Sequence, residues 1–382
     1  MHPEQAAFFY RQLIELIALR PADFILQYQK QFGDLTKNLA QQLNGLQKVH
    51  KKLPQWFANE AILYPPNLNL EQCSSELTAK YKASLCSGKS SIDLTGGFGV
   101  DSYFLNQAFK EHTYVEQQSD LFEIVCQNFK SLGAEALHAH KGSGIEWLTS
   151  SGQQYDLIFA DPSRRVSGGK KFVIDHCEPN LIEVQDLLLE KGNQVMYKLS
   201  PLLDITSLVR QLKGVQAIHI VSVKNECKEL LVMASKEHTK SPHIYTVNFL
   251  DESRAEHFNF SLEHAKVKTT RYSKALNYLY EPNASLLKSG AFDYVGDAFN
   301  LYKLHANTQL YTSSELLMDW PGRVFEIVDR PFTRVNVISR NHPLSPKQLI
   351  KKFRLTDGAN AEFLLAFTDI EKPKTVFARK LS

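Results

Sequence analysis

Apolar residues in the first 88 positions recur at the three- and four-residue spacing of helices. The pattern is clear over residues 8–17, 35–53 and 70–85. Apolar positions at this spacing line one face of a helix, which can then pack on a core. We therefore expect an N-terminal helical region over residues 1–88.

Between residues 89 and 250 the pattern changes to short apolar runs that alternate with helical stretches. Such alternation predicts a mainly parallel sheet with helices on both faces, a doubly wound, Rossmann-like α/β fold. The last two runs before residue 243 are so close in sequence that we expect an antiparallel hairpin. The expected strands are 91–94, 113–116, 136–139, 155–160, 194–199, 217–223, 230–234 and 243–249, and the expected helices are 100–109, 120–132, 181–190 and 205–212.

The regular alternation stops after residue 250. Residues 264–320 are mixed in pattern, and residues 321–382 predict a small α+β unit. That unit has strands expected at 324–328, 335–338 and 361–368 and a helix at 345–353. Its net charge is +6, whereas the rest of the chain carries −3. A basic unit of this size is compatible with a polyanionic partner such as RNA.

Composition narrows the class of protein. The 382 residues are 43% hydrophobic and 22% charged, as in globular proteins. The five cysteines form no C-x-x-C pair, which argues against a disulfide framework or a structural zinc site. We see no cluster with metal-ligand spacing, no secretory signal and no apolar run of about 18 residues. We expect a cytoplasmic protein without a metal, and its oligomeric state stays open.

A glycine-rich turn follows the first expected strand, at residues 93–101, with the sequence D-L-T-G-G-F-G-V-D. Glycines let the backbone pass close under a ligand, and the N-terminus of the following helix offers free N–H groups. Glu116 closes the next strand, 23 residues after Asp93, where an acid can hold both ribose hydroxyls. The candidate cofactor-binding residues are Asp93, Thr95, Gly96, Gly97, Gly99, Asp101 and Glu116.

The acid before the glycines favours S-adenosylmethionine (SAM) over a dinucleotide. A carboxylate at Asp93 would repel a pyrophosphate, but it attracts the ammonium and sulfonium groups of SAM. The last glycine of the dinucleotide pattern is also replaced, by Ser102. An NAD-dependent oxidoreductase is therefore a distant alternative. The alternative is a purely structural role, in which Asp93 caps a helix and Glu116 is a solvated charge at a strand end.

A second motif, Asp161-Pro162-Ser163-Arg164, follows the strand expected at 155–160. It resembles the [DN]-P-P-[YFW] motif of amino-group methyltransferases, in which the acid or amide and the proline carbonyl hold the target amine. Ser163 and Arg164 depart from that pattern, because the second proline and the aromatic are missing. Arginine can stack on a base or hold a phosphate. We take these four residues as catalytic candidates, with an ordinary Asp-Pro turn as the alternative.

Two further segments carry weaker signals. Lys198 ends the strand at 194–199 and could reach a substrate phosphate, although a surface lysine is the favoured interpretation. The polar segment 71–82 could cover the cofactor, and the alternative is that Ser74 or Ser75 only caps a helix.

Several phrases together resemble a known family. D-L-T-G-G-F-G-V-D, A-D-P-S-R-R, K-L-S-P-L-L-D and E-C-K-E-L-L, with E-P-N-A-S-L-L-K-S-G and W-P-G-R-V-F, are similar to class I SAM-dependent methyltransferases with a C-terminal THUMP-like domain, found mainly in Bacteroidetes-type bacteria. The resemblance implies a SAM site at 93–101 and Glu116, with 161–164 facing the substrate. It also implies a methyltransferase domain over 89–250, a ferredoxin-like domain over 264–320 and a THUMP-like domain over 321–382.

These observations predict a SAM-dependent methyltransferase that acts on a nitrogen of a tRNA or rRNA base. RNA as the partner follows by analogy with the true THUMP domain, an RNA-binding module. Two alternatives stay open. One is methylation of a small molecule or protein, and the other is a non-catalytic RNA-binding protein that retains the SAM fold.

Overall fold

The computed structural model describes residues 3–134, 137–164, 174, 177–237, 239–266 and 270–381. The chain divides into two compact units. The first unit comprises Met1–Leu199, Thr206–Val215 and Val232–His238, and the second comprises Ser200–Ile205, Gln216–Leu231 and Thr239–Ser382. Among the helices of the described residues, none has the length and apolar character to span a lipid bilayer.

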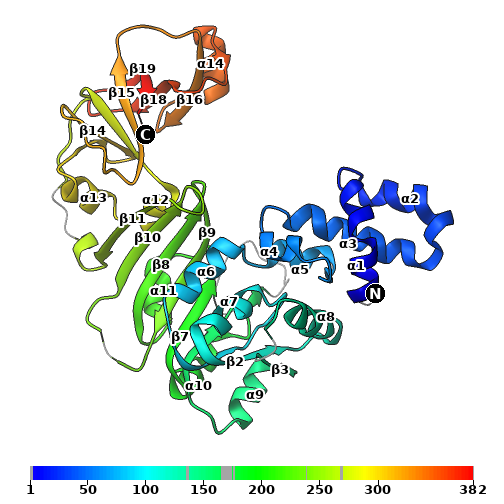
Figure 1. Ribbon diagram of the computed structural model, residues 1–382. Coiled ribbons are helices and arrows are strands. Elements are labelled where there is room, and N and C mark those ends of the chain that lie inside the picture. The colour runs from blue at the N-terminus through cyan, green and yellow to red at the C-terminus, as the bar shows by residue number, and fades with distance from the viewer. Residues whose placement is uncertain are drawn as a thin grey trace. The chain divides into compact units, whose positions relative to one another are not determined.

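The first unit begins with the expected helical region (Figure 1). Its helices are α1 (Pro3–Glu15), α2 (Pro21–Phe32), α3 (Thr36–Val49), α4 (Pro54–Ala58), α5 (Asn67–Gln72) and α6 (Glu76–Ser84). The prediction of one helix over 70–85 is wrong, because the chain breaks between α5 and α6. Ser75 has an extended backbone and caps α6 by accepting the Thr78 N–H at 3.2 Å.

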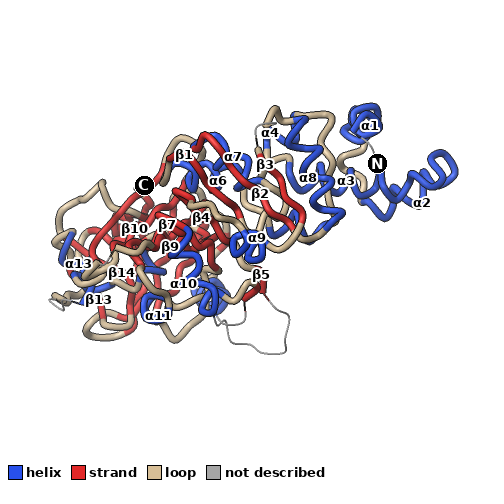
Figure 2. The backbone as a smooth tube through the Cα atoms, turned by 90° about the horizontal axis from the view of Figure 1, so that it is seen from below, coloured by secondary structure: helices blue, strands red, loops and turns tan. Residues whose placement is uncertain are grey.

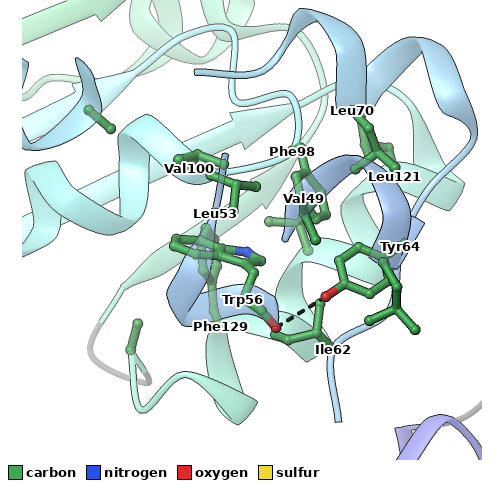
Figure 3. Close-up of a cluster of buried hydrophobic side chains, with 14 of the residues drawn as sticks. Val49, Leu53, Trp56, Ile62, Tyr64, Leu70, Phe98, Val100, Leu121 and Phe129 are labelled. Carbon is green, nitrogen blue, oxygen red and sulfur yellow. Dashed lines mark hydrogen bonds between the residues drawn. The ribbon is translucent and has the colours of Figure 1, made fainter. Parts of the chain in front are cut away.

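The helical region shares one core with the α/β part of the unit. Helices α3 and α4 bury a cluster of apolar side chains against α7 (Val100–Ala108) and α8 (Ser119–Ser131) (Figure 3). Trp56 belongs to this cluster, with its ring centroid 5.0 Å from that of Tyr103 and 6.0 Å from that of Phe104. The N-terminal region is therefore part of the unit's core.

The strands of the first unit lie in the order β7-β4-β1-β2-β3, and every pair among them is parallel. Strands β4, β1 and β2 run side by side in Figure 2, and helix α7 packs on β1 and β2. The strands are β1 (Gly88–Asp93), β2 (Phe109–Glu116), β3 (His138–Lys141), β4 (Tyr155–Ala160) and β7 (Gly192–Leu199), and the remaining helices are α9 (Gly144–Ser150), α10 (Leu181–Lys191) and α11 (Ile205–Gln211). The expected α/β fold class is confirmed. Because the strands are parallel, their carboxyl ends meet at one edge of the sheet.

The second unit begins with the hairpin expected near residue 225. Strands β8 (Val215–Val223) and β9 (Glu226–Ala234) are neighbours joined by Lys224 and Asn225, which both have positive φ, 50° and 62°. Two such residues in a row are typical of a tight hairpin turn. Strand β10 (His243–Phe249) pairs in parallel with β8, and β11 (Ala255–Ser261), which the pattern did not indicate, pairs antiparallel with β10.

A second sheet follows in the order β13-β14-β12-β15-β19-β18-β16-β17. Its elements are β12 (Tyr278–Pro282), α12 (Ala284–Ser289), α13 (Phe292–Ala298), β13 (Tyr302–His305), β14 (Thr308–Ser313), β15 (Gly322–Val328), β16 (Arg334–Arg340), α14 (Pro346–Phe353), β17 (Thr356–Asp357), β18 (Glu362–Thr368) and β19 (Pro373–Lys380). Glu281 of β12 is buried and bonds Arg340 of β16 at 2.8 Å and Arg323 of β15. This carboxylate ties the two halves of the sheet together.

Candidate cofactor and substrate site

The glycine-rich loop between β1 and α7 is closely packed on its inner side. A Cβ atom at Gly96 would lie 2.1 Å from the Tyr114 ring, and one at Gly99 would lie 2.7 Å from both Val125 and Phe129. At Gly97, by contrast, φ is +55° and a Cβ would approach only the Thr95 carbonyl oxygen, at 3.7 Å. Gly96 and Gly99 are therefore required by packing, whereas there is open space beside the Cα atom of Gly97.

Asp93 is buried beneath this loop, with 1% of its surface exposed. One carboxylate oxygen accepts the Thr95 N–H at 2.9 Å, and the other accepts the Ser102 hydroxyl at 2.7 Å. Burial raises the pKa of Asp93 to about 7, although these hydrogen bonds favour the ionised form. Asp93 thus shapes the loop from inside. Ser102, which replaces the last glycine of the dinucleotide pattern, is its partner.

Glu116 at the end of β2 holds the same loop from the other side. Its Oε2 accepts the Gly97 N–H at 2.9 Å, and its Oε1 accepts the Gln118 N–H at 2.7 Å. The Tyr114 hydroxyl donates to the Gly97 carbonyl at 2.8 Å. Each oxygen of a carboxylate can accept more than one hydrogen bond, so Glu116 retains acceptor capacity for a ligand's hydroxyl groups.

Asp101, in the first turn of α7, is enclosed by charged and polar partners from elsewhere in the chain. The Ser74 hydroxyl donates to it at 2.7 Å, and the ammonium groups of Lys82 and Lys198 lie 3.1 and 3.8 Å from its oxygens. Burial by itself would raise the pKa of Asp101, but these partners outweigh it and hold the pKa below its usual value. Asp101 therefore joins α6 to α7, a role that its place in the loop did not indicate.

Asp161 follows β4 at the same edge of the sheet. Its backbone N–H donates to the Thr95 hydroxyl at 2.7 Å, and its Oδ2 accepts a hydrogen bond from Lys198. The side chain of Lys198 is only 11% exposed, so the favoured interpretation of a surface lysine is wrong. The motif's acid is thus joined directly to the glycine-rich loop.

The other candidates of this motif lie further from the loop. Pro162 is half-buried, and Ser163 is exposed with its hydroxyl 3.5 Å from the Glu178 carbonyl. The backbone of Arg164 pairs with Cys177 in the short sheet of β5 (Ser163–Arg164) and β6 (Cys177–Glu178). The side chain of Arg164 lies outside the described part of the chain, as do residues 165–173.

Sequence reasoning missed Lys82 altogether. It named Ser74 and Ser102 without their hydrogen bonds to Asp101 and Asp93, and it favoured a surface position for Lys198. The signal for Lys198 was its place at the end of a strand beside β4. For Lys82, nothing in the pattern of α6 distinguishes it from a surface lysine. The site's charges suit a cation, because it holds four carboxyl groups and two ammonium groups. Lys82 and Lys198 pair with Asp101 and Asp161, whereas Asp93 and Glu116 accept hydrogen bonds from uncharged groups. The described residues contain no group of three His, Cys, Asp or Glu that could hold a metal.

Comparison with known families confirms the expected resemblance at the C-terminus. Residues 278–321 match a ferredoxin-like domain, and residues 325–380 match a THUMP domain-like family. A search of curated proteins found no match.

Solved structures extend the likeness to the whole chain. A crystal structure from Porphyromonas gingivalis W83, titled a "putative methyltransferase", is 29% identical, covers 100% of both chains and has a TM-score of 0.87. An rRNA methylase from Streptococcus thermophilus is 15% identical and covers 42% of this chain and 95% of its own, with a TM-score of 0.32. The chain therefore shares the fold of the Porphyromonas gingivalis protein over its full length and ends in ferredoxin-like and THUMP domain-like units.

Proposed function

We propose that this protein is a SAM-dependent methyltransferase that acts on a nitrogen of a tRNA or rRNA base. The observation that carries the proposal is that Glu116, the open space beside Gly97 and Asp161 meet at the carboxyl edge of one parallel sheet. Ligands of open α/β sheets bind at this edge. The full-length likeness to the Porphyromonas gingivalis protein supports the same reaction class.

Different residues of the chain bind the cofactor and position the substrate. Glu116 receives the ribose hydroxyls of SAM, the loop around Gly97 lies along its methionine part, and buried Asp93 and Asp101 shape that loop. When bound, SAM supplies an activated methyl group. Asp161 and the Pro162 carbonyl hold the target amine, so catalysis here is mainly positioning. A base can reach the site only when it is unpaired or flipped out of a helix.

RNA is the proposed substrate because the C-terminal unit matches a THUMP domain-like family and carries a net charge of +6 over residues 321–382. A basic unit can bind the phosphate backbone without reading its sequence.

The five cysteines are free, which suits the reducing cytoplasm where such an enzyme would act.

Replacing Glu116 with alanine is expected to weaken SAM binding at least about tenfold, or about 1.4 kcal/mol. The variant loses the ribose acceptor and releases the Gly97 N–H. Titration calorimetry with SAM measures the effect. Glu111→Ala is the matched control, because Glu111 lies on the same strand with its side chain exposed, and it should bind as the wild type does.

The outcomes separate the alternatives. No SAM binding by the wild type would overturn the proposed function. If SAM binds, transfer of tritium from methyl-labelled SAM to unmodified tRNA or rRNA transcripts supports RNA as the substrate. Transfer to protein or small-molecule extracts instead would retain the methyltransferase and remove RNA.

SAM binding should also tighten as the pH rises from 6 to 8. The raised pKa of Asp93, about 7, means that it ionises across this interval, and the cationic ligand favours the ionised form. One coupled proton can change the affinity up to about tenfold over this range. Calorimetry at several pH values measures it, and Asp93→Asn should flatten the dependence. A pH-independent affinity in the wild type would contradict this role of Asp93.

A further inference from the structure

We infer that Lys198 is a positioning residue for methyl transfer. It holds Asp161 by one oxygen and balances the charge of that carboxylate, so that the other oxygen is presented to the target amine. This inference rests on the proposed function and adds a residue and a charge balance to it.

The sheet register brings the two side chains together. Strands β4 and β7 pair in parallel with Ala160 opposite Tyr197, so the next residues along, Asp161 and Lys198, are also neighbours. The Lys198 ammonium bonds Asp161 Oδ2. Because the lysine is largely buried, its charge is weakly screened by solvent and the pair has little freedom to rearrange.

Asp161 is also held from the opposite side. Its N–H donates to the Thr95 hydroxyl at 2.7 Å, and Thr95 is itself fixed by its N–H bond to Asp93. No described residue donates to Asp161 Oδ1, and the side chain is 36% exposed. One carboxylate oxygen is thus anchored, and the other oxygen has no donor among the described residues in a partly exposed side chain, which leaves it able to accept from an amino group.

The positive charge of Lys198 also offsets the negative charge of the carboxylates around it. Its ammonium lies 3.8 Å from Asp101 in addition to its bond to Asp161, so it offsets two carboxylates at once. SAM carries a sulfonium charge that S-adenosylhomocysteine (SAH) lacks, while the two ligands are otherwise alike apart from one methyl group. The ratio of their affinities therefore reports the charge balance of this site without any methyl acceptor.

The test compares Lys198→Met, Lys198→Arg and the wild type by calorimetric titration with SAM and with SAH. In Lys198→Met the uncompensated carboxylates should favour the cation, and the ratio of the SAH to the SAM dissociation constant should rise at least about threefold. Lys198→Arg keeps the charge and should stay near the wild-type ratio. Lys213→Met is the matched control, since Lys213 is 57% exposed and bonds Asp186 at 2.7 Å on the surface, and it should leave the ratio unchanged.

With an RNA acceptor, Lys198→Met should also lower kcat at least about tenfold and leave the KM for RNA nearly unchanged, because the amine is bound but misoriented. If Lys198→Met fails to fold, Lys198→Gln removes the charge and retains a hydrogen bond, and its ratio should rise in the same way. An unchanged ratio in a folded, SAM-binding neutral variant overturns this inference. Absence of SAM binding in the wild type would overturn the proposed function instead.

Discussion

Replacing Lys82 with methionine should lower the free energy of unfolding by about 3–5 kcal/mol. The Lys82 side chain is fully buried, and its ammonium lies 3.1 Å from Asp101 and 3.1 Å from the Ser74 hydroxyl. Among the described residues, Asp101 then keeps the more distant Lys198 as its cationic partner. Removing one partner of a buried ion pair is costly because the other charge stays in a poorly solvated place.

Hydrogen exchange of the α6 and α7 amides measures this loss locally, independently of the second unit. Lys80→Met is the matched control on the same helix. Lys80 is 52% exposed and lies 3.4 Å from Glu76, so its loss should cost no more than about 1 kcal/mol. The double variant Lys82→Met with Asp101→Leu removes both charges and should recover much of the stability. A cost below about 1 kcal/mol for Lys82→Met would show that the pair contributes little.

Replacing Trp56 with alanine should cost about 3–5 kcal/mol as well, for a different reason. The Trp56 side chain is 1% exposed and lies in the cluster drawn in Figure 3. Its ring contacts those of Tyr103 and Phe104 of α7. Truncation leaves a cavity that rigid neighbours cannot fully close.

Urea unfolding followed by circular dichroism measures the effect of this truncation. Phe8→Ala is the control, because Phe8 is 71% exposed on α1, and it should change stability by less than about 0.5 kcal/mol. If Trp56→Ala unfolds only residues 1–88 and leaves the sheet's hydrogen-exchange protection intact, the helical region is a separate domain. Loss of protection in α7 and β2 is the result expected from the shared core.

The local order of apolar and polar residues determined much of the fold. The alternation of strands and helices over 89–250 predicted the parallel sheet, because period-2 and period-3.6 burial are properties of neighbouring residues. The positions of the glycine-rich loop, Glu116 and Asp161 at strand ends follow from the same pattern. Strands β11 and β19 were not predicted, because each fully buries a single residue and forms only through pairing with β10 or with β15 and β18.

The details of the site depended on long-range packing. The sequence placed Asp93 before the glycines, but only the tertiary structure buries it against Ser102 and raises its pKa. Lysines look alike in a sequence whether they are solvated or buried. Lys82 and Lys198 differ from surface lysines because α6 and β7 bring them to Asp101 and Asp161, residues 19 and 37 positions away along the chain. Periodicity and backbone requirements are encoded locally, whereas the burial and pairing of charges are decided only when distant elements meet.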